Sequence, residues 1–270
     1  MTLPQLKIIA RQIRRDIIEM TYQAGSGHPG GSLSAADIMA VLYFDVMKHD
    51  PQKPEWQKRD RFFLSKGHAC PVLYAALAEA GYFSKKHLAA FRHLGSVLQG
   101  HPHRLKTPGV EMSSGSLGQG LSIAAGTALG LRMDGGKHRV FCLMGDGELQ
   151  EGQIWEAAMA AGHFKLNNLI GIVDYNNLQI DGPVEKVMGL APLADKWRAF
   201  RWNVIEVDGH DIQRIKKAFI KAGQSKTRPT VIIARTVKGK GVSFMENQAG
   251  WHGRAPNREE YMKAIAELNR

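Results

Sequence analysis

Two oxygen-bearing side chains have the spacing expected of a metal site at the edge of a parallel sheet. Asp146 stands in Gly145-Asp146-Gly147, directly after an apolar run, and Asn176 follows the next apolar run. Residues 148 to 175 give room for one helix and one strand, so both side chains can lie at neighbouring strand ends. A carboxylate and an amide oxygen, completed by a backbone carbonyl, water and phosphate oxygens, suit octahedral Mg²⁺.

The alternative interpretation of Gly-Asp-Gly is a simple turn, and the paired asparagine argues against it. The glycines would let the backbone approach an anion, and the N-terminus of a following helix would favour negative charge there. A second amide pair, Asn167-Asn168, precedes its strand, so we assign it to a loop at the opposite edge of the sheet. The pattern therefore favours a phosphate-bearing ligand bound together with a metal ion.

Four histidines stand beside glycine or proline and are expected on loops of fixed backbone: His28, His68, His101 and His252. One such histidine is usually a polar surface residue, but four indicate convergence on one pocket. Neutral imidazole can donate to phosphate or exchange protons near pH 7. Zinc is not expected, because His-x-x-His spacing is absent and His101-Pro102-His103 is too close and rigid for a metal pair.

Strands alternate with helices along the chain, which predicts a mostly parallel sheet covered by helices on both faces, an α/β fold. We expect one domain over residues 1–270, because no linker or change in composition divides the sequence. The predicted strands are 61–64, 139–144, 169–173, 204–207 and 230–234. The predicted helices are 6–20, 35–47 capped by Ser34, 70–80, 85–93, 152–163, 211–223, 258–268 and a small-residue helix after the turn at 113–116.

Four polar segments follow predicted strands and should therefore meet at one edge of the sheet. They are Ser65-Lys66-Gly67-His68, Gly145-Asp146-Gly147, Asp174-Tyr175-Asn176-Asn177 and Val237-Lys238-Gly239-Lys240-Gly241.

The composition is that of a cytoplasmic protein with a positive surface. The formal charge of +11 is spread along the chain, so nucleic acid is not an expected partner. Two cysteines exclude a disulfide scaffold and fit a reducing compartment. No apolar stretch is long enough to span a membrane or to act as a signal peptide, so no membrane partner is expected.

In combination these residues resemble the transketolase family, over about residues 5–260. The run from Gly145-Asp146-Gly147 to Asn176 is similar to the thiamine-diphosphate signature. The flanking motifs resemble transketolase in particular: Gly25-Ser26-Gly27-His28-Pro29-Gly30, Ser65-Lys66-Gly67-His68-Ala69, Gly100-His101-Pro102, Gly115-Ser116-Leu117-Gly118-Gln119-Gly120 and Trp251-His252-Gly253. The resemblance corresponds to the N-terminal, diphosphate-binding domain of a full-length transketolase, a thiamine-diphosphate-binding fold of the PP type.

The resemblance implies a role for each matching position. Asp146 and Asn176 would bind Mg²⁺ through their side chains and Leu178 through its backbone carbonyl, with Ca²⁺ or Mn²⁺ as substitutes. The residues expected to contact the diphosphate are His68, Gly147, Lys238 and His252, and the turn Gly115-Ser116-Leu117 would line the cofactor pocket. His28, His101 and His252 would face the sugar and move protons. Arg92 would lie near the acceptor's phosphate, and Glu151 would link paired active sites.

Two positions depart from the pattern of many full-length transketolases. Ser116 stands where they have proline, and His103 stands where they often have glutamate. Both fit the split type of the enzyme, and the second bears on the choice of substrate.

The implied function is transfer of a two-carbon ketol unit from a ketose phosphate to an aldose phosphate. The next transketolase domain supplies a glutamate for the cofactor's aminopyrimidine ring, and we expect it on a second polypeptide, because the chain ends at Arg270. The expected complex is a heterotetramer of two copies of this chain and two of a C-terminal partner subunit.

We considered three other functions. The first is a subunit of another thiamine-diphosphate enzyme, such as a 2-oxo acid dehydrogenase α subunit or a deoxyxylulose phosphate synthase. The second is a non-catalytic regulatory protein of the same fold, against which the retained Asp146, Asn176 and histidines argue. The third is a nicotinamide-dependent enzyme, for which the glycines of residues 115–120 have the wrong offsets.

Overall fold

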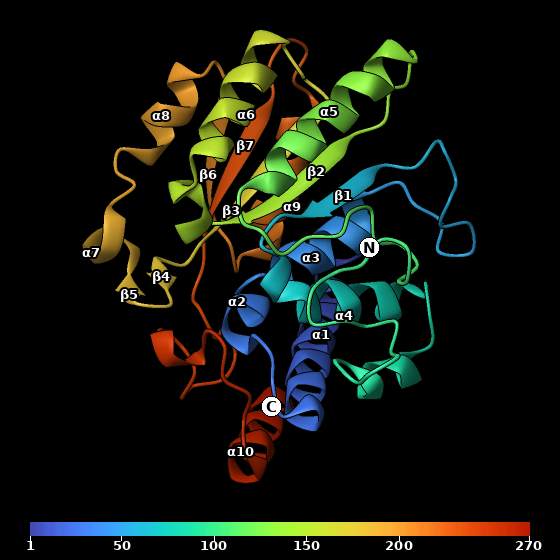
Figure 1. Ribbon diagram of the computed structural model, residues 1–270, viewed down its shortest axis with the longest axis vertical. Helices are drawn as coiled ribbons and strands as arrows, with labels where there is room; N and C mark the ends of the chain where they lie inside the picture. The colour runs from blue at the N-terminus through green and yellow to red at the C-terminus, as the bar shows by residue number, and fades with distance from the viewer.

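Five parallel strands form the central sheet, in the order β1-β2-β3-β7-β6 (Figure 1). The computed structural model describes residues 1–270. The strands are β1 (Arg61–Leu64), β2 (Val140–Gly145), β3 (Leu169–Tyr175), β6 (Asn203–Asp208) and β7 (Thr230–Arg235). All five predicted strands are therefore confirmed. β4 (Leu178–Gln179) and β5 (Gly182–Pro183) form a separate two-stranded antiparallel sheet.

Alternate residues of the central strands enter two separate apolar cores, one on each face of the sheet. In β2, Phe141 and Leu143 join the larger core, and Cys142 and Met144 join the smaller one. Helices must cover both faces of such a sheet, because a parallel sheet with two apolar faces cannot expose either to water.

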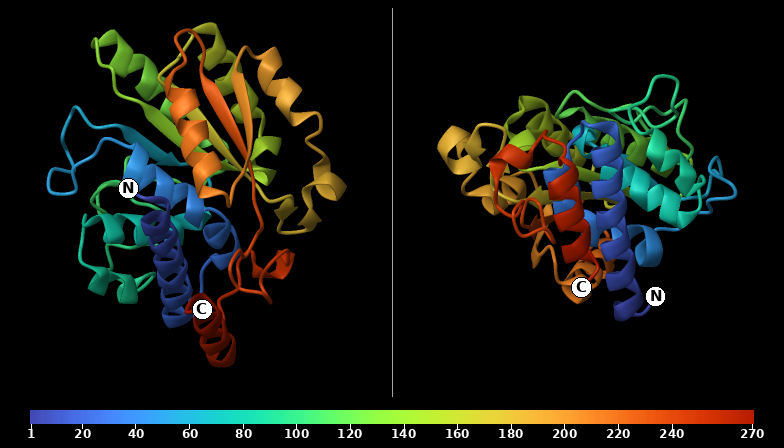
Figure 2. Two further views of the ribbon diagram at one scale, coloured as in Figure 1. Left: turned by 180° about the vertical axis from the view of Figure 1, so that it is seen from behind. Right: turned by 90° about the horizontal axis from the view of Figure 1, so that it is seen from below.

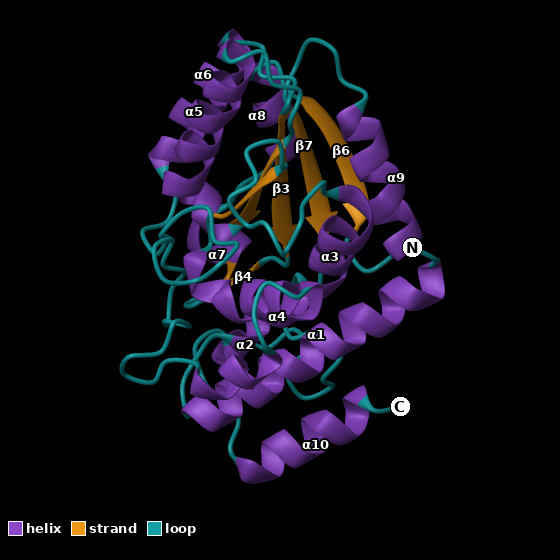
Figure 3. Ribbon diagram, turned by 90° about the vertical axis from the view of Figure 1, so that its right-hand side faces the viewer, coloured by secondary structure: helices purple, strands orange, loops and turns teal.

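The helices lie in layers on either side of the sheet. Figure 3 shows α5, α6 and α8 on one side and α3 and α9 on the other. Their bounds are α1 (Leu3–Ala24), α2 (Pro29–Ser34), α3 (Ala36–Val41), α4 (Cys70–Ala80), α5 (Gln119–Met133), α6 (Gly152–His163), α7 (Val184–Met188), α8 (Leu193–Ala199), α9 (Ile212–Gly223) and α10 (Arg258–Leu268). None of them is both long and apolar enough to cross a membrane.

The C-terminal helix packs beside the N-terminal helix. The right-hand view of Figure 2 shows α10 next to α1. The rings of Tyr22 and Tyr261 stack between them with their centroids 4.2 Å apart. Both ends of the chain therefore lie on the side of the molecule where α1 packs against α10.

The predicted helix over residues 35–47 is confirmed in its extent by α3 and the π-helical turn that continues it, but the predicted cap at Ser34 is wrong. Ser34 is the last residue of α2, and α3 ends at Val41 in a turn of π-helix over Leu42–Val46. The Ser34 hydroxyl donates to Asp174 Oδ2 on β3, so a partner distant in sequence takes the place of the local cap. The predicted helix 85–93 is only a 3₁₀ turn over Lys85–Ala90, and Arg92 has a left-handed backbone at φ 63°.

After β3 the strands no longer follow one another in the order of the chain. The chain passes from β2 through α6 to the adjacent β3, then crosses to the edge strand β6. Helix α9 returns it to β7, which lies between β3 and β6. In open parallel sheets ligands bind beyond the carboxyl ends of the strands.

Candidate active site

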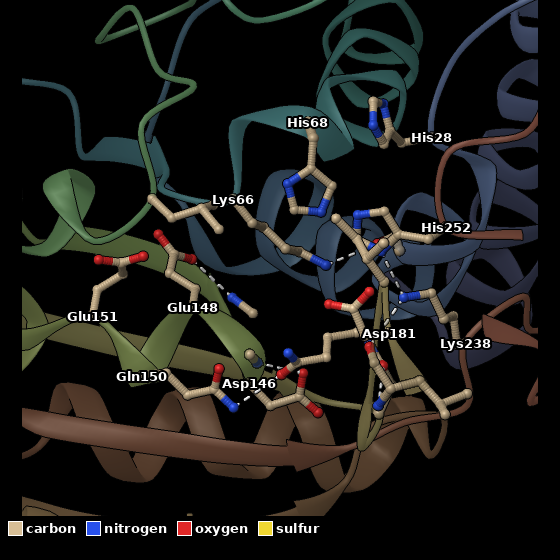
Figure 4. Close-up of a pocket in the computed structure, with 18 of the residues that line it drawn as sticks. His28, Lys66, His68, Asp146, Glu148, Gln150, Glu151, Asp181, Lys238 and His252 are labelled. Carbon is tan, nitrogen blue, oxygen red and sulfur yellow. Dashed lines mark hydrogen bonds between the residues drawn. The ribbon is translucent and has the colours of Figure 1, made fainter. Parts of the chain in front are cut away.

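A cavity of about 350 Å³ opens at the carboxyl ends of the strands (Figure 4). Residues from all four predicted strand-end segments line it, which confirms that these segments meet: Lys66, His68, Gly145, Asp146, Gly147, Asn176 and Lys238. His28, Gly115, Leu117, Glu151, Leu178 and His252 complete the predicted residues that line it.

The three residues predicted as metal ligands all line the cavity. The buried carboxylate of Asp146 accepts hydrogen bonds from Gly147 N at 2.8 Å and from Asn177 N. The Asn176 side-chain oxygen accepts one from Leu178 N at 3.1 Å. The loop after β3 therefore bends back over Asp146 and brings both side chains and the Leu178 backbone to one place.

The donor set fits a divalent cation that is bound together with a diphosphate. Carboxylate, amide and carbonyl oxygens are the hard ligands that Mg²⁺ prefers. The ammonium group of Lys238 lies beside them and is suited to bind phosphate oxygens. A Cβ atom added at Gly31 would come no closer than 3.8 Å to any other group, here His68 Nε2, so a side chain there would take up space in the cavity. Glycine at this position leaves that part of the cavity open.

The charged groups of the cavity are poorly solvated. Burial, followed by the nearby Asp174 charge, raises the pKa of Asp146 to about 6. Burial also lowers the pKa of Lys238 to about 8. Each group would gain from a bound ion of opposite charge, because such an ion replaces the solvation that burial removes.

The four predicted histidines form one cluster. The ring of His28 is central, with centroids 5.3 Å from His68, 5.6 Å from His252 and 6.5 Å from His101. The rings of His68 and His252 stack with centroids 4.9 Å apart. The loops predicted from their glycine and proline neighbours therefore converge.

The histidines of this cluster are neutral at pH 7. Burial and the Arg92 charge lower the pKa of His28 to about 4, and burial and the Lys238 charge lower that of His252 to about 3. Burial, with Lys66 second, brings the pKa of His68 well below its usual value. Burial and Arg92 also lower that of His101. Each ring can therefore donate from one nitrogen and accept at the other.

A buried ion pair that the sequence reasoning missed supports the cavity from beneath. Lys66 Nζ contacts Asp174 Oδ2, and both side chains are almost fully buried. Asp174 also accepts from the Ser34 and Thr236 hydroxyls. The pair joins α2, β1, β3 and the end of β7 below the site.

Glu148 is a second buried charge that was not predicted. Its carboxylate accepts from Gly118 N at 2.9 Å, from Gly145 N at 3.0 Å and from the Ser65 hydroxyl. Burial raises its pKa. Its position directly after Gly-Asp-Gly was the available signal, since a carboxylate there can reach free backbone amides.

Some predicted residues lie outside the cavity lining. Arg92 lies beside His28, with Nη2 3.5 Å from His28 Nδ1, and the ring centroid of His101 is 6.5 Å from that of His28. Ser116 is exposed and does not line the cavity. Glu151 is exposed and lies across the cavity from His252 in Figure 4. Lining residues that were not predicted include Gln150, Gln179, Ile180 and Asp181.

Comparison with known proteins gives one consistent result. The family model for the thiamine diphosphate binding domain of transketolase matches residues 6–268. One of the subunits of the apulose-4-phosphate transketolase of Phocaeicola vulgatus is 41% identical over 269 residues, which cover 100% of this chain and 95% of that protein. The 6-deoxy-6-sulfo-D-fructose transketolase subunit SqwG of a Clostridium species is 45% identical over 261 residues, covering 97% of this chain and 95% of that protein.

The fold agrees with a solved structure of greater total length. The crystal structure of transketolase from Campylobacter jejuni superposes with a TM-score of 0.95 at 38% identity. The match covers 100% of this chain and 43% of that chain. The chain thus spans nearly the whole length of the two relatives that are named as subunits, and about two-fifths of the longer enzyme chain.

Proposed function

The chain belongs to the family of transketolase thiamine-diphosphate-binding domains, and we propose that it is the cofactor-binding subunit of a split transketolase. One observation carries the proposal: hard oxygen atoms, two buried ammonium groups and three histidines with lowered pKa values meet in one cavity at the carboxyl ends of the strands. A 2-oxo acid dehydrogenase or deoxyxylulose phosphate synthase subunit would share the metal and diphosphate residues. The family match supports transketolase over both.

The proposed cofactor site has two parts. Asp146, Asn176 and the Leu178 carbonyl would hold Mg²⁺, while His68, Lys238 and His252 would bind the diphosphate with the Gly147 backbone. The metal would balance diphosphate charge that Lys238 alone leaves uncompensated, since Lys66 is paired with Asp174. Bound thiamine diphosphate would supply the electron sink for cleaving the carbon–carbon bond of the sugar.

The remaining residues would act on the sugar. His28 and His252 are neutral near pH 7, so either ring can take a proton from a sugar hydroxyl and return it. His101 would do the same. Arg92 lies beside His28 and would bind the phosphate of the sugar.

A partner subunit is part of the proposal. Two relatives named as subunits match this chain over 95% of their own length. The partner would carry the pyrimidine-binding and C-terminal domains and cover the open side of the cavity, in a complex of two copies of each chain. Glu151 is exposed at the cavity wall and would connect the paired sites across that interface.

Titration calorimetry of the purified chain tests the cofactor site. We expect thiamine diphosphate to bind only when Mg²⁺ is present, with weak affinity in the absence of a partner. Equal heats with Mg²⁺ and with excess chelator would contradict the site.

A further inference from the structure

The loop after β7 carries Lys238, and a side chain outside the cavity holds the backbone of this loop. Thr236 N still bonds to Tyr175 O on β3 at 3.1 Å, as a strand residue would. The next amide, Val237 N, instead donates to His210 Nε2 at 2.8 Å. His210 follows the end of β6 and does not line the 350 Å³ cavity.

The hydrogen bonds fix the tautomer of His210. A backbone N–H can only donate, so Nε2 must be the unprotonated nitrogen of the ring. The ring proton is therefore on Nδ1, which donates to Asp37 Oδ2 at 2.8 Å. The imidazole is held at both nitrogens and cannot rotate without losing one of the two bonds.

Asp37 is itself held by Arg14. The guanidinium donates from Nη1 to Oδ1 at 3.1 Å and from Nη2 to Oδ2 at 2.5 Å, and both residues are buried. Burial alone would raise the pKa of Asp37, but the Arg14 charge holds it below its usual value. The carboxylate thus stays ionised as a firm acceptor for the His210 ring.

The other side of the loop is anchored as well. Gly239 N donates to Gly30 O at 3.0 Å, and a Cβ atom on Gly30 would lie 3.1 Å from Lys238 Cγ. The lysine stem therefore leaves the backbone between two fixed amides. Its ammonium group then reaches Leu178 O at 3.0 Å and His252 Nδ1 at 2.9 Å.

We propose that His210 is a positioning residue for the diphosphate site: Arg14 and Asp37 fix its ring, and the ring fixes Val237 so that Lys238 points into the cavity. This inference rests on the proposed function, because it takes Lys238 as a diphosphate contact. It assigns the chain Arg14–Asp37–His210 a role in cofactor affinity although none of the three touches the cavity.

Two substitutions of His210 test the roles of its two ring nitrogens separately. The Gln side chain in His210→Gln can set its amide oxygen near the position of Nε2 and accept from Val237 N. The shorter Asn side chain in His210→Asn reaches only the position of Nδ1, so it keeps the bond to Asp37 and leaves Val237 N unpaired. We expect His210→Asn to weaken Mg²⁺-dependent thiamine diphosphate binding about tenfold in calorimetry, and His210→Gln to stay within about threefold of wild type. Equal affinity for wild type and His210→Asn overturns the proposal, as does equal loss in both variants.

Lys238→Ala in the same titration distinguishes failure of the diphosphate assignment from failure of the positioning role. Loss of affinity in Lys238→Ala with wild-type affinity in His210→Asn refutes only the positioning role. Wild-type affinity in Lys238→Ala refutes the diphosphate assignment and the positioning role with it.

Hydrogen exchange in the wild-type chain without cofactor gives a readout that does not depend on the variants folding. The Val237 amide should exchange far more slowly than exposed loop amides, and nitrogen NMR should find the His210 proton on Nδ1. Fast exchange at Val237, or a proton on Nε2, overturns the proposal.

Discussion

Lys238 Nζ donates to the carbonyl oxygen of Leu178 at 3.0 Å, so the cation of the proposed diphosphate site touches an oxygen of the proposed metal site. The Asp146 charge acts on the same ammonium group. Metal, diphosphate and lysine would thus share one small set of oxygen atoms. Loss of a single oxygen ligand should therefore weaken binding of both the metal and the diphosphate.

We predict that Asp146→Ala abolishes Mg²⁺-dependent binding of thiamine diphosphate and leaves the fold intact. Removal of a carboxylate from a site of hard ligands leaves the diphosphate charge poorly balanced. Titration calorimetry measures the effect. Asp195→Ala is the matched control, because that carboxylate is exposed on α8 and pairs only with Arg198. Wild-type affinity in Asp146→Ala would sink the metal assignment.

His101→Ala should lower turnover far more than cofactor affinity. His101 belongs to the histidine cluster but does not line the 350 Å³ cavity, and we propose that it faces the sugar. Loss of a general acid or base costs on the order of 10²–10⁴-fold in rate. The assay is ketol transfer by the complex with its partner, and the exposed His87→Ala is the control. Normal turnover in His101→Ala would make this histidine structural only.

The histidine cluster should make the chain sensitive to acid. His28 and His252 have pKa values of about 4 and about 3 in the fold, below the usual 6.5. As the pH falls below 6.5, the unfolded chain therefore binds more protons than the folded chain. The free energy of unfolding decreases progressively until the pH reaches the pKa values of the folded state. The raised pKa values of Asp16 and Asp146 act in the opposite direction.

A comparison of two proteins isolates this effect. Urea denaturation of wild type and of a His28→Gln/His252→Gln variant should give stabilities that diverge with pH. Between pH 7 and pH 4.5, the wild type should lose more stability than the variant. Parallel curves for the two proteins would contradict the shifted pKa values.

Lys66→Met should destabilise the fold by about 3–5 kcal/mol, because it leaves the Asp174 charge buried without its partner. Burial alone would raise the pKa of Asp174, but the Lys66 charge holds it below its usual value. Denaturant unfolding measures the loss. Arg198→Met removes an exposed pair with Asp195 and should cost about 1 kcal/mol or less. Similar losses of stability in the two variants would show that the buried pair contributes no more than an exposed one.

The strands and their carboxyl-end segments could be predicted from the sequence, because apolar runs followed by glycine and polar residues are local signals. The role of Ser34 could not be predicted, because its hydroxyl donates to Asp174, far away in the chain, and does not cap the helix that follows. The same holds for the pairing of Lys66 with Asp174, 108 residues away, and for the contact of Glu148 with Ser65, 83 residues away. The place of β7 between β3 and β6 is likewise a tertiary choice that no local pattern encodes.

Ketol transfer by the reconstituted complex tests the central claim most directly. The purified chain, shown by mass spectrometry to lack any partner, should transfer no two-carbon unit between sugar phosphates. Addition of a second polypeptide with the pyrimidine-binding and C-terminal domains should restore transfer in a complex of two copies of each chain. Robust turnover by this chain alone would contradict the account.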